Sequence, residues 1–224
     1  MSKSGLLPFL FVSFFFALPL RAASLQAELV DSAGQPLVNA VLTLQGPLDG
    51  VSAVTAGVMD QRAQQFVPHV LAVRTGTAVS FPNSDDIRHH VYSFSPAKRF
   101  ELRLYKGTPS EPVLFDTPGV VVLGCNIHDW MVGYVYVTDD PWFAVSDEQG
   151  RVQLDGLPPG RYQATLWHSQ LDGLLSQPGG ELQLGATGIR QRFVLAVQPV
   201  EPAPTRAPTS AFGDAFKSAR DAAQ

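Results

Sequence analysis

Short apolar runs alternate with turn residues along most of the chain. The runs are rich in Val, Tyr, Phe and Leu and span residues 27–30, 40–44, 78–81, 90–94, 120–123, 134–137, 162–167 and 192–197. Pairs such as Ala33-Gly34, Gln149-Gly150 and Pro159-Gly160 separate them, as turns separate strands. Almost no segment shows the 3.6-residue period of an amphipathic helix. The pattern therefore predicts an all-β protein built as a sandwich.

The N-terminus has the pattern of a secretory signal peptide. A basic residue is followed by an apolar run over residues 6–20 and by small residues at positions 22–24. An uncleaved membrane anchor is the alternative, but the run is shorter than the roughly 20 residues that a spanning helix needs, and it contains Pro8 and Pro19. We expect residues 1–23 to be removed, leaving a periplasmic protein without a stable membrane span.

Composition narrows the classes of protein further. The chain has 224 residues, of which 45% are hydrophobic and 16% charged, which is enough for one large domain or two small ones. The formal net charge of −4 makes nucleic acid an unexpected partner. The single cysteine, Cys125, excludes an intramolecular disulfide and leaves a lone thiol in an exported protein.

Two segments, residues 81–91 and 124–133, carry side chains that bind soft metals. The first is a strand running into a loop that ends in two histidines, and the second is a loop between two predicted strands. The candidate ligands are Cys125, His128 and Met131 on the second segment, and His89 or His90 on the first. One thiolate, two imidazoles and one thioether form the ligand set of a blue copper site. Coordination would also protect the lone thiol from oxidation.

The same segments resemble the cupredoxin family, most closely its amicyanin-like and plastocyanin-like electron carriers. The resemblance rests on the pattern C-x2-H-x2-M-x-G-x-V-x-V that begins at Cys125, and on Asn83 upstream of the histidine pair. It covers roughly residues 51–138. Residues 66–69 also resemble periplasmic cupredoxin-like proteins of the methylamine-utilisation type.

The resemblance implies a Greek-key β-sandwich with one type 1 copper ion. In the family motif, Asn is followed by five residues and then by the ligand, which corresponds to His89. The chain departs from the motif at His90, where these carriers commonly have Asn, so His90 is the alternative ligand. His128 and Cys125 correspond to the other equatorial ligands and Met131 to the axial one.

Each of these residues also has a simpler interpretation. A lone cysteine in a β protein is usually a small buried apolar residue, which is the simpler interpretation of Cys125. Met131, taken alone, would be a residue that fills the core. His69 and His168 have no partner at ligand spacing, so we expect both to be structural or surface residues. Trp130 is open to two interpretations, a docking surface around His128 or plain packing.

The segments on either side of the copper-binding region form a second pattern. Residues 27–44 and 147–162 each read as strand, turn and strand, and resemble the two halves of a carboxypeptidase regulatory-like, transthyretin-like sandwich. We predict that this smaller sandwich comprises residues 25–48 plus 139–198, with the cupredoxin domain, residues 51–138, inserted between the halves. The competing hypothesis is that both hairpins extend the central sandwich. Residues 199–224 read as a Pro-rich linker and tail.

The function that these patterns predict is the transfer of single electrons between a donor and an acceptor redox protein. The sequence shows no Ser-His-Asp arrangement, no paired carboxylates with a clear role and no phosphate loop, so we do not expect an enzyme. Two alternatives remain: a copper storage or delivery protein, and a metal-independent β-sandwich binding module.

Overall fold

The computed structural model describes residues 23–51, 56–109 and 111–198. All but the last residue of the predicted signal peptide, residues 1–23, lies outside these ranges, and so does the whole predicted tail, residues 199–224. In the described part of the chain, no helix is long and apolar enough to cross a membrane.

The described residues are almost entirely β-structure, which confirms the predicted all-β class. Their only helix is a short 3-10 turn, Asp172–Leu174. The strands are β1 (Ala23–Asp31), β2 (Val41–Gln45), β3 (Ala56–Val58), β4 (Asp60–Arg62), β5 (Gln65–Val67), β6 (Val70–Arg74), β7 (Thr77–Ser80), β8 (His89–Ser95), β9 (Lys98–Tyr105), β10 (Val113–Phe115), β11 (Gly119–Cys125), β12 (His128–Thr138), β13 (Trp142–Val145), β14 (Arg151–Leu157), β15 (Gly160–Trp167), β16 (Gln177–Leu184) and β17 (Ile189–Leu195). Each apolar run of the sequence overlaps one of these strands.

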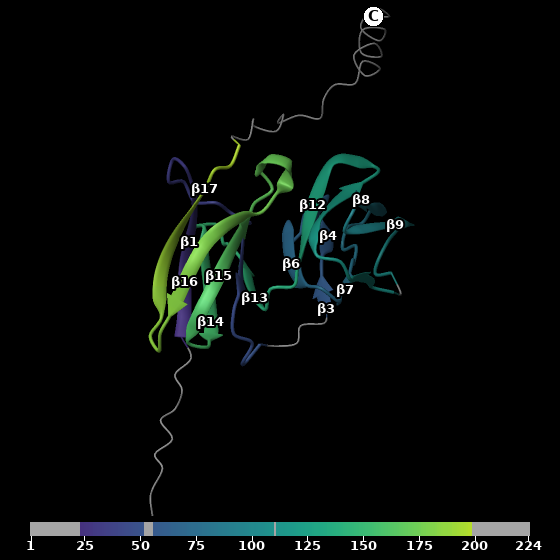
Figure 1. The fold of residues 1–224 in the computed structure, drawn as a ribbon. Helices are drawn as coiled ribbons and strands as arrows, with labels where there is room; N and C mark the ends of the chain where they lie inside the picture. The colour runs from purple at the N-terminus through teal and green to yellow at the C-terminus, as the bar shows by residue number, and fades with distance from the viewer. Residues whose placement is uncertain (1–22, 52–55, 110, 199–224) are drawn as a thin grey trace, which may run out of the picture.

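Strands β3 to β12 form what we call the central sandwich (Figure 1). A five-stranded sheet, in the order β6-β12-β11-β8-β9, packs against the three-stranded sheet β10-β7-β3, and the β4–β5 hairpin lies beside them. Side chains alternate between the faces of each strand, so one face of β11 places Val121 and Leu123 in the core. Phe81 and Phe115 fill the same core, with ring centroids 6.3 Å apart.

The remaining strands form a second unit, the flanking sandwich, in which the two ends of the described chain meet. Its sheets have the orders β14-β1-β17 and β13-β2-β15-β16. Leu25 in β1 is in register with Leu154 on one side and with Ile189 on the other. The pairing between residues 25–44 and 151–197 that the insertion hypothesis requires is therefore present. The domain boundaries proposed from the sequence remain a prediction.

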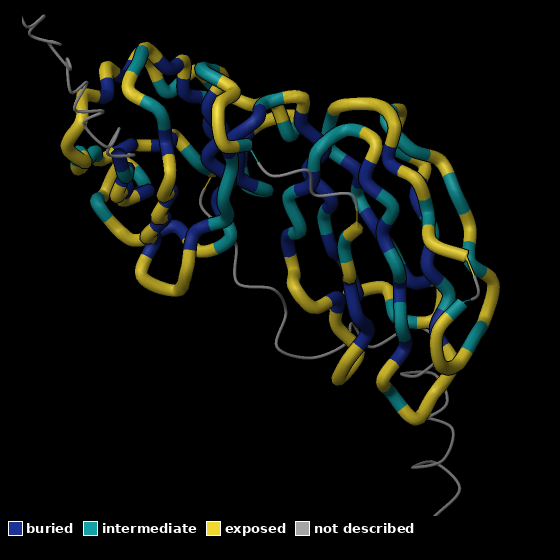
Figure 2. Tube along the Cα trace, turned by 90° about the horizontal axis from the view of Figure 1, so that it is seen from below, coloured by how far each residue is buried: buried dark blue, intermediate teal, exposed yellow. Residues whose placement is uncertain are grey.

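The two sandwiches lie side by side (Figure 1), and each buries a core (Figure 2). Side chains of strand β12 pack into both cores. Val135 and Val137 point into the core of the central sandwich. Tyr134 and Tyr136, on the other face, pack against Trp167 of the flanking sandwich, with ring centroids 5.6 and 5.5 Å away. The strand that begins at His128 is thus held on both faces.

The loop predicted for residues 124–133 is wrong, because most of that segment is strand. β11 continues to Cys125 and β12 starts at His128, so only residues 126–127 form the turn. The segment lacks regular alternation of apolar residues, and Gly133 is a residue that weakens strands. Here Gly133 is required by packing: a Cβ atom added to it would lie 2.7 Å from the Cβ of Phe66.

We predict that Gly133→Ala destabilises the protein by about 1–3 kcal/mol, the usual cost of overpacking. The added methyl group would collide with the Cβ and ring of Phe66, which cannot swing away as a flexible side-chain end would. Urea unfolding monitored by circular dichroism measures the effect. Gly185→Ala is the matched control, because a Cβ there meets no atom within 4 Å. Equal stability of the two variants would contradict the close packing described here.

Candidate metal centre

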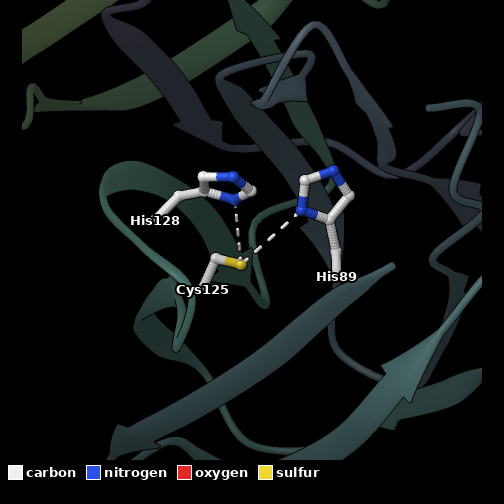
Figure 3. Close-up of side chains that lie close together, drawn as sticks. All are labelled: His89, Cys125 and His128. Atoms are coloured by element: carbon white, nitrogen blue, oxygen red, sulfur yellow. Dashed lines mark hydrogen bonds between the residues drawn. The ribbon is translucent and has the colours of Figure 1, made fainter. Parts of the chain in front are cut away.

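Three side chains converge at one end of the central sandwich (Figure 3). The Sγ atom of Cys125 lies 3.6 Å from Nδ1 of His89 and 3.7 Å from Nδ1 of His128. One sulfur or nitrogen atom from each of the three residues lies within 4.8 Å of the other two. Cys125 and His89 are buried, and His128 is half-buried.

The strand register brings these residues together although His89 and Cys125 are 36 positions apart in the sequence. β11 lies between β8 and β12 in the five-stranded sheet. Cys125, its last residue, pairs with His128, the first residue of β12, and with Val91 near the start of β8. His89 lies two residues before Val91, so both point to the same, inward face. The three candidate ligands therefore come from the adjoining ends of three hydrogen-bonded strands.

The separations between the sulfur and the two nitrogens suit ligands of one metal ion. With metal–sulfur and metal–nitrogen bonds of about 2.3 and 2.0 Å and angles of roughly 110–120°, two such ligands lie about 3.5–3.7 Å apart. A thiol has one proton and cannot donate it to two imidazoles at once. Three soft and borderline donors facing one point are the arrangement of a His2Cys copper plane. The donor set thus fits a copper ion.

A carboxylate fixes the orientation of His89. Nε2 of His89 lies 2.8 Å from Oδ2 of Asp85. An ionised carboxylate only accepts hydrogen bonds, so Nε2 is the donor of this pair, and in the neutral ring Nδ1 then presents its lone pair to Cys125. Burial acts to raise the pKa of Asp85, but hydrogen bonds from the Gln64 backbone and from His89 outweigh it and hold that pKa below its ordinary value. Sequence reasoning missed Asp85, because its role depends on contacts across the fold.

Met131 lies in the same part of the molecule. It is buried in β12, belongs to the same apolar cluster as Cys125, and lines one pocket with it. These observations place Met131 in the same part of the core as Cys125.

His90 points away from this cluster. Adjacent residues of a strand face opposite sides of the sheet, so the burial of His89 turns His90 outward. Its Nε2 atom lies 3.0 Å from Oε1 of Glu101 on β9, at the distance of an ion pair. Of the two adjacent histidines, the structure places His89 beside Cys125.

Asn83 holds the loop that leads to His89. Its side-chain amide donates to the carbonyl oxygens of Ile87 and Tyr105, each at 2.9 Å. The hydroxyl of Tyr105 donates to the carbonyl of Phe81 at 2.7 Å, and burial raises the pKa of this phenol above its ordinary value. These bonds tie the start of the loop to Tyr105, the last residue of β9, and tie Ile87 back to Asn83.

The two other histidines singled out in the sequence are bound to the scaffold. His69 lies edge-on to Tyr134, with ring centroids 5.4 Å apart. Nε2 of His168 lies 3.0 Å from the carbonyl oxygen of Val38. Burial lowers the pKa of both imidazoles, which favours their neutral form. Neither belongs to the His-Cys-His group.

Exposed apolar side chains lie near His128. Ile127 and Trp130 are 46% and 59% exposed, and the ring of Trp130 lies 5.2 Å from that of His128. Ile87, in the loop before His89, is 42% exposed. Burial, and then the neighbouring His89, lower the pKa of His128, which favours the neutral imidazole that a metal requires.

Comparisons with known proteins give partial matches to solved structures. No family model matches the chain, and no curated protein matches it. Solved structures similar to it include a purple cupredoxin from Nitrosopumilus maritimus, with 23% identity, 37% of this chain and 99% of that chain covered, and a TM-score of 0.33. A reduced amicyanin mutant shows 20% identity over 42% of this chain and 99% of its own, with a TM-score of 0.33.

A third similar structure is the copper-containing nitrite reductase of Thermus scotoductus SA-01. It is 23% identical over 50% of this chain and 28% of its own length, with a TM-score of 0.35. At such scores these neighbours do not define a family for the chain, and the metal site is judged on its own geometry. The comparisons lend no support to the transthyretin-like resemblance of the flanking sandwich, which remains a prediction.

We predict that His89→Ala weakens Cu(I) binding by more than the roughly 10–100-fold that follows loss of a residue outside the ligand set. His90→Ala should leave the affinity unchanged, because His90 faces Glu101 on the other side of the sheet. Competition against a coloured Cu(I) chelator measures both values. The reverse order of effects would assign the ligand to His90.

Proposed function

We propose that the protein is a type 1 copper protein that carries single electrons between redox partners. Cys125, His89 and His128 would hold the ion, and Met131 would be a fourth, weaker ligand. The observation that carries the proposal is the convergence of one sulfur and two imidazole nitrogens, at 3.6 and 3.7 Å from the sulfur, in a group that is buried on one side.

A copper ion held by these residues would supply a one-electron couple between Cu(I) and Cu(II). The chain's contribution is a frame that changes little between the two states. Thiolate and thioether suit Cu(I), while imidazole suits both states. His89, Cys125 and His128 stand at the ends of strands that are hydrogen-bonded to one another, so their positions are set by the sheet. A small rearrangement on electron transfer favours a fast exchange.

Electrons would enter and leave on the side of His128. This imidazole is the most exposed of the three converging side chains, and Ile127 and Trp130 expose apolar surface around it. Exposed apolar patches of this kind are typical of docking sites for proteins. We therefore propose that a redox protein docks over His128, and this favours the docking interpretation of Trp130.

We infer the compartment from the N-terminal sequence. The predicted signal peptide would export the chain to the periplasm, where free thiols are readily oxidised. Burial of Cys125 and coordination by copper would keep the thiolate reduced. We propose periplasmic electron transfer without catalysis of a substrate reaction by the protein itself.

The direct test is to load the purified protein with Cu(II) and record its visible spectrum. We expect one equivalent of copper and a strong thiolate-to-copper absorption band, which Cys125→Ser abolishes because the only thiol is gone. The loaded protein should then be reduced by one small-molecule donor and reoxidised by an acceptor without losing copper.

The outcomes separate the alternative functions. A protein that stays colourless and does not bind copper contradicts the proposal and favours a metal-independent binding module. A protein that binds copper but passes it to a chelator instead of cycling between redox states is a storage or delivery protein. Only reversible cycling with copper retained supports an electron carrier.

The proposed role of Met131 can be tested by the reduction potential of the copper-loaded protein. Met131→Leu should keep the copper and the colour but raise the midpoint potential, because loss of a donor disfavours the more electron-poor Cu(II) state. Met59→Leu is the matched control, since Met59 is equally buried in the same apolar cluster without belonging to the proposed ligand set. Cyclic voltammetry of the three proteins measures the shift. Equal potentials for the two variants would show that Met131 is core packing.

A further inference from the structure

Asp85 is held from three directions in the loop that precedes His89. Its Oδ2 atom lies 2.8 Å from Nε2 of His89. The same carboxylate accepts the backbone N–H groups of Ala63 at 2.7 Å and of Gln64 at 2.9 Å. The side chain is 15% exposed. This carboxylate therefore joins a proposed ligand to a segment about 20 residues earlier in the chain.

The two backbone donors belong to the tip of the β4–β5 hairpin. Ala63 and Gln64 have φ angles of 51° and 59°, and the flanking residues Arg62 and Gln65 pair with each other. Two consecutive left-handed residues are typical of the tight hairpin turn that joins twisted strands. Successive backbone N–H groups can form a concave site for an anion, and here the anion is the Asp85 side chain.

The hairpin also holds the backbone of the Asp85 loop. Gln61 donates its N–H to the carbonyl of Pro82 and accepts from the N–H of Ser84, both at 3.0 Å. The hydroxyl of Ser84 donates to Asp60 at 2.8 Å. Besides its contact with His89, Asp85 and its loop are therefore held by contacts that involve no ligand of the proposed metal.

We propose that Asp85 is a positioning residue that sets the tautomer and orientation of His89, with the hairpin tip as its anchor. The inference rests on the proposed copper site and deepens it. With the Nε2 proton directed to Asp85, the Nδ1 lone pair faces Cys125 and is ready to bind. Carboxylates in this position also increase the electron donation of the imidazole, and losing them typically lowers metal affinity by about 10–100-fold.

The neighbouring aspartate provides a matched control. The side chain of Asp86 is fully exposed and lies 3.3 Å from Nζ of Lys106. Asp85→Asn and Asp86→Asn remove the same charge one residue apart, so an effect of general electrostatics would appear in both variants. Only Asp85→Asn alters the partner of His89.

The first measurement is nitrogen-15 NMR of the histidine rings in the metal-free protein. We expect the Nε2–H tautomer for His89 in the wild type and in Asp86→Asn, and a mixture of tautomers in Asp85→Asn, whose amide can both donate and accept. The second measurement is Cu(I) affinity by chelator competition. It should fall about 10–100-fold in Asp85→Asn and stay at the wild-type value in Asp86→Asn.

The results separate this inference from the proposed function. Wild-type tautomer and affinity in Asp85→Asn would overturn the positioning role while leaving the copper site intact. A wild type that binds no copper would contradict the proposed function, and the ring tautomers would still test Asp85. If Asp85→Asn fails to fold, the wild-type spectrum decides, because an Nδ1–H tautomer of His89 is incompatible with the proposal.

Discussion

The pairing of β11 with β8 and β12 is the constraint on which the metal centre depends. His89, Cys125 and His128 lie at strand ends, and their separations follow from the register, in which Cys125 pairs with both His128 and Val91. A slip of one residue in either pair would turn a ligand to the opposite face, because side chains alternate along a strand. The register is itself fixed by the buried face of the sheet, where Val121, Leu123 and Val135 fill the core. Core packing and ligand geometry are thus two consequences of one arrangement.

The site has a rigid side and an open side. His89 is buried, and its outer nitrogen is bound to Asp85, which the hairpin holds in turn. His128 is half-exposed among apolar side chains, and its ring lies beside Trp130. This asymmetry suits the proposed electron carrier: the buried side would keep the ligands in place, while the exposed imidazole would bring the site within reach of a partner.

Much of the fold and of the candidate metal site could be predicted from the sequence, because strand patterning and ligand chemistry are local properties. The apolar runs indicated the all-β class, and the spacing of Cys125, His128 and Met131 indicated a soft-metal site. The hairpin contacts to Asp85 could not be predicted, since they join segments whose closeness depends on the whole fold. The strand character of residues 128–133 was also missed, because the packing of Gly133 against Phe66 is a tertiary contact that outweighs local propensity.

The flanking sandwich packs against β12, the strand that carries two of the proposed copper ligands, and against residues of β6 and β11. β12 begins at His128 and, a few residues later, places Tyr134 and Tyr136 against Trp167. The hydroxyl of Tyr136 also lies 3.0 Å from Oγ of Ser176. These contacts fix the outer face of the strand while Val135 and Val137 fix its inner face. Because packed interiors resist small displacements, a strand held on both faces cannot shift along its axis without disturbing two cores. The second sandwich thereby stiffens the strand that supplies His128 and Met131, although it contributes no ligand itself.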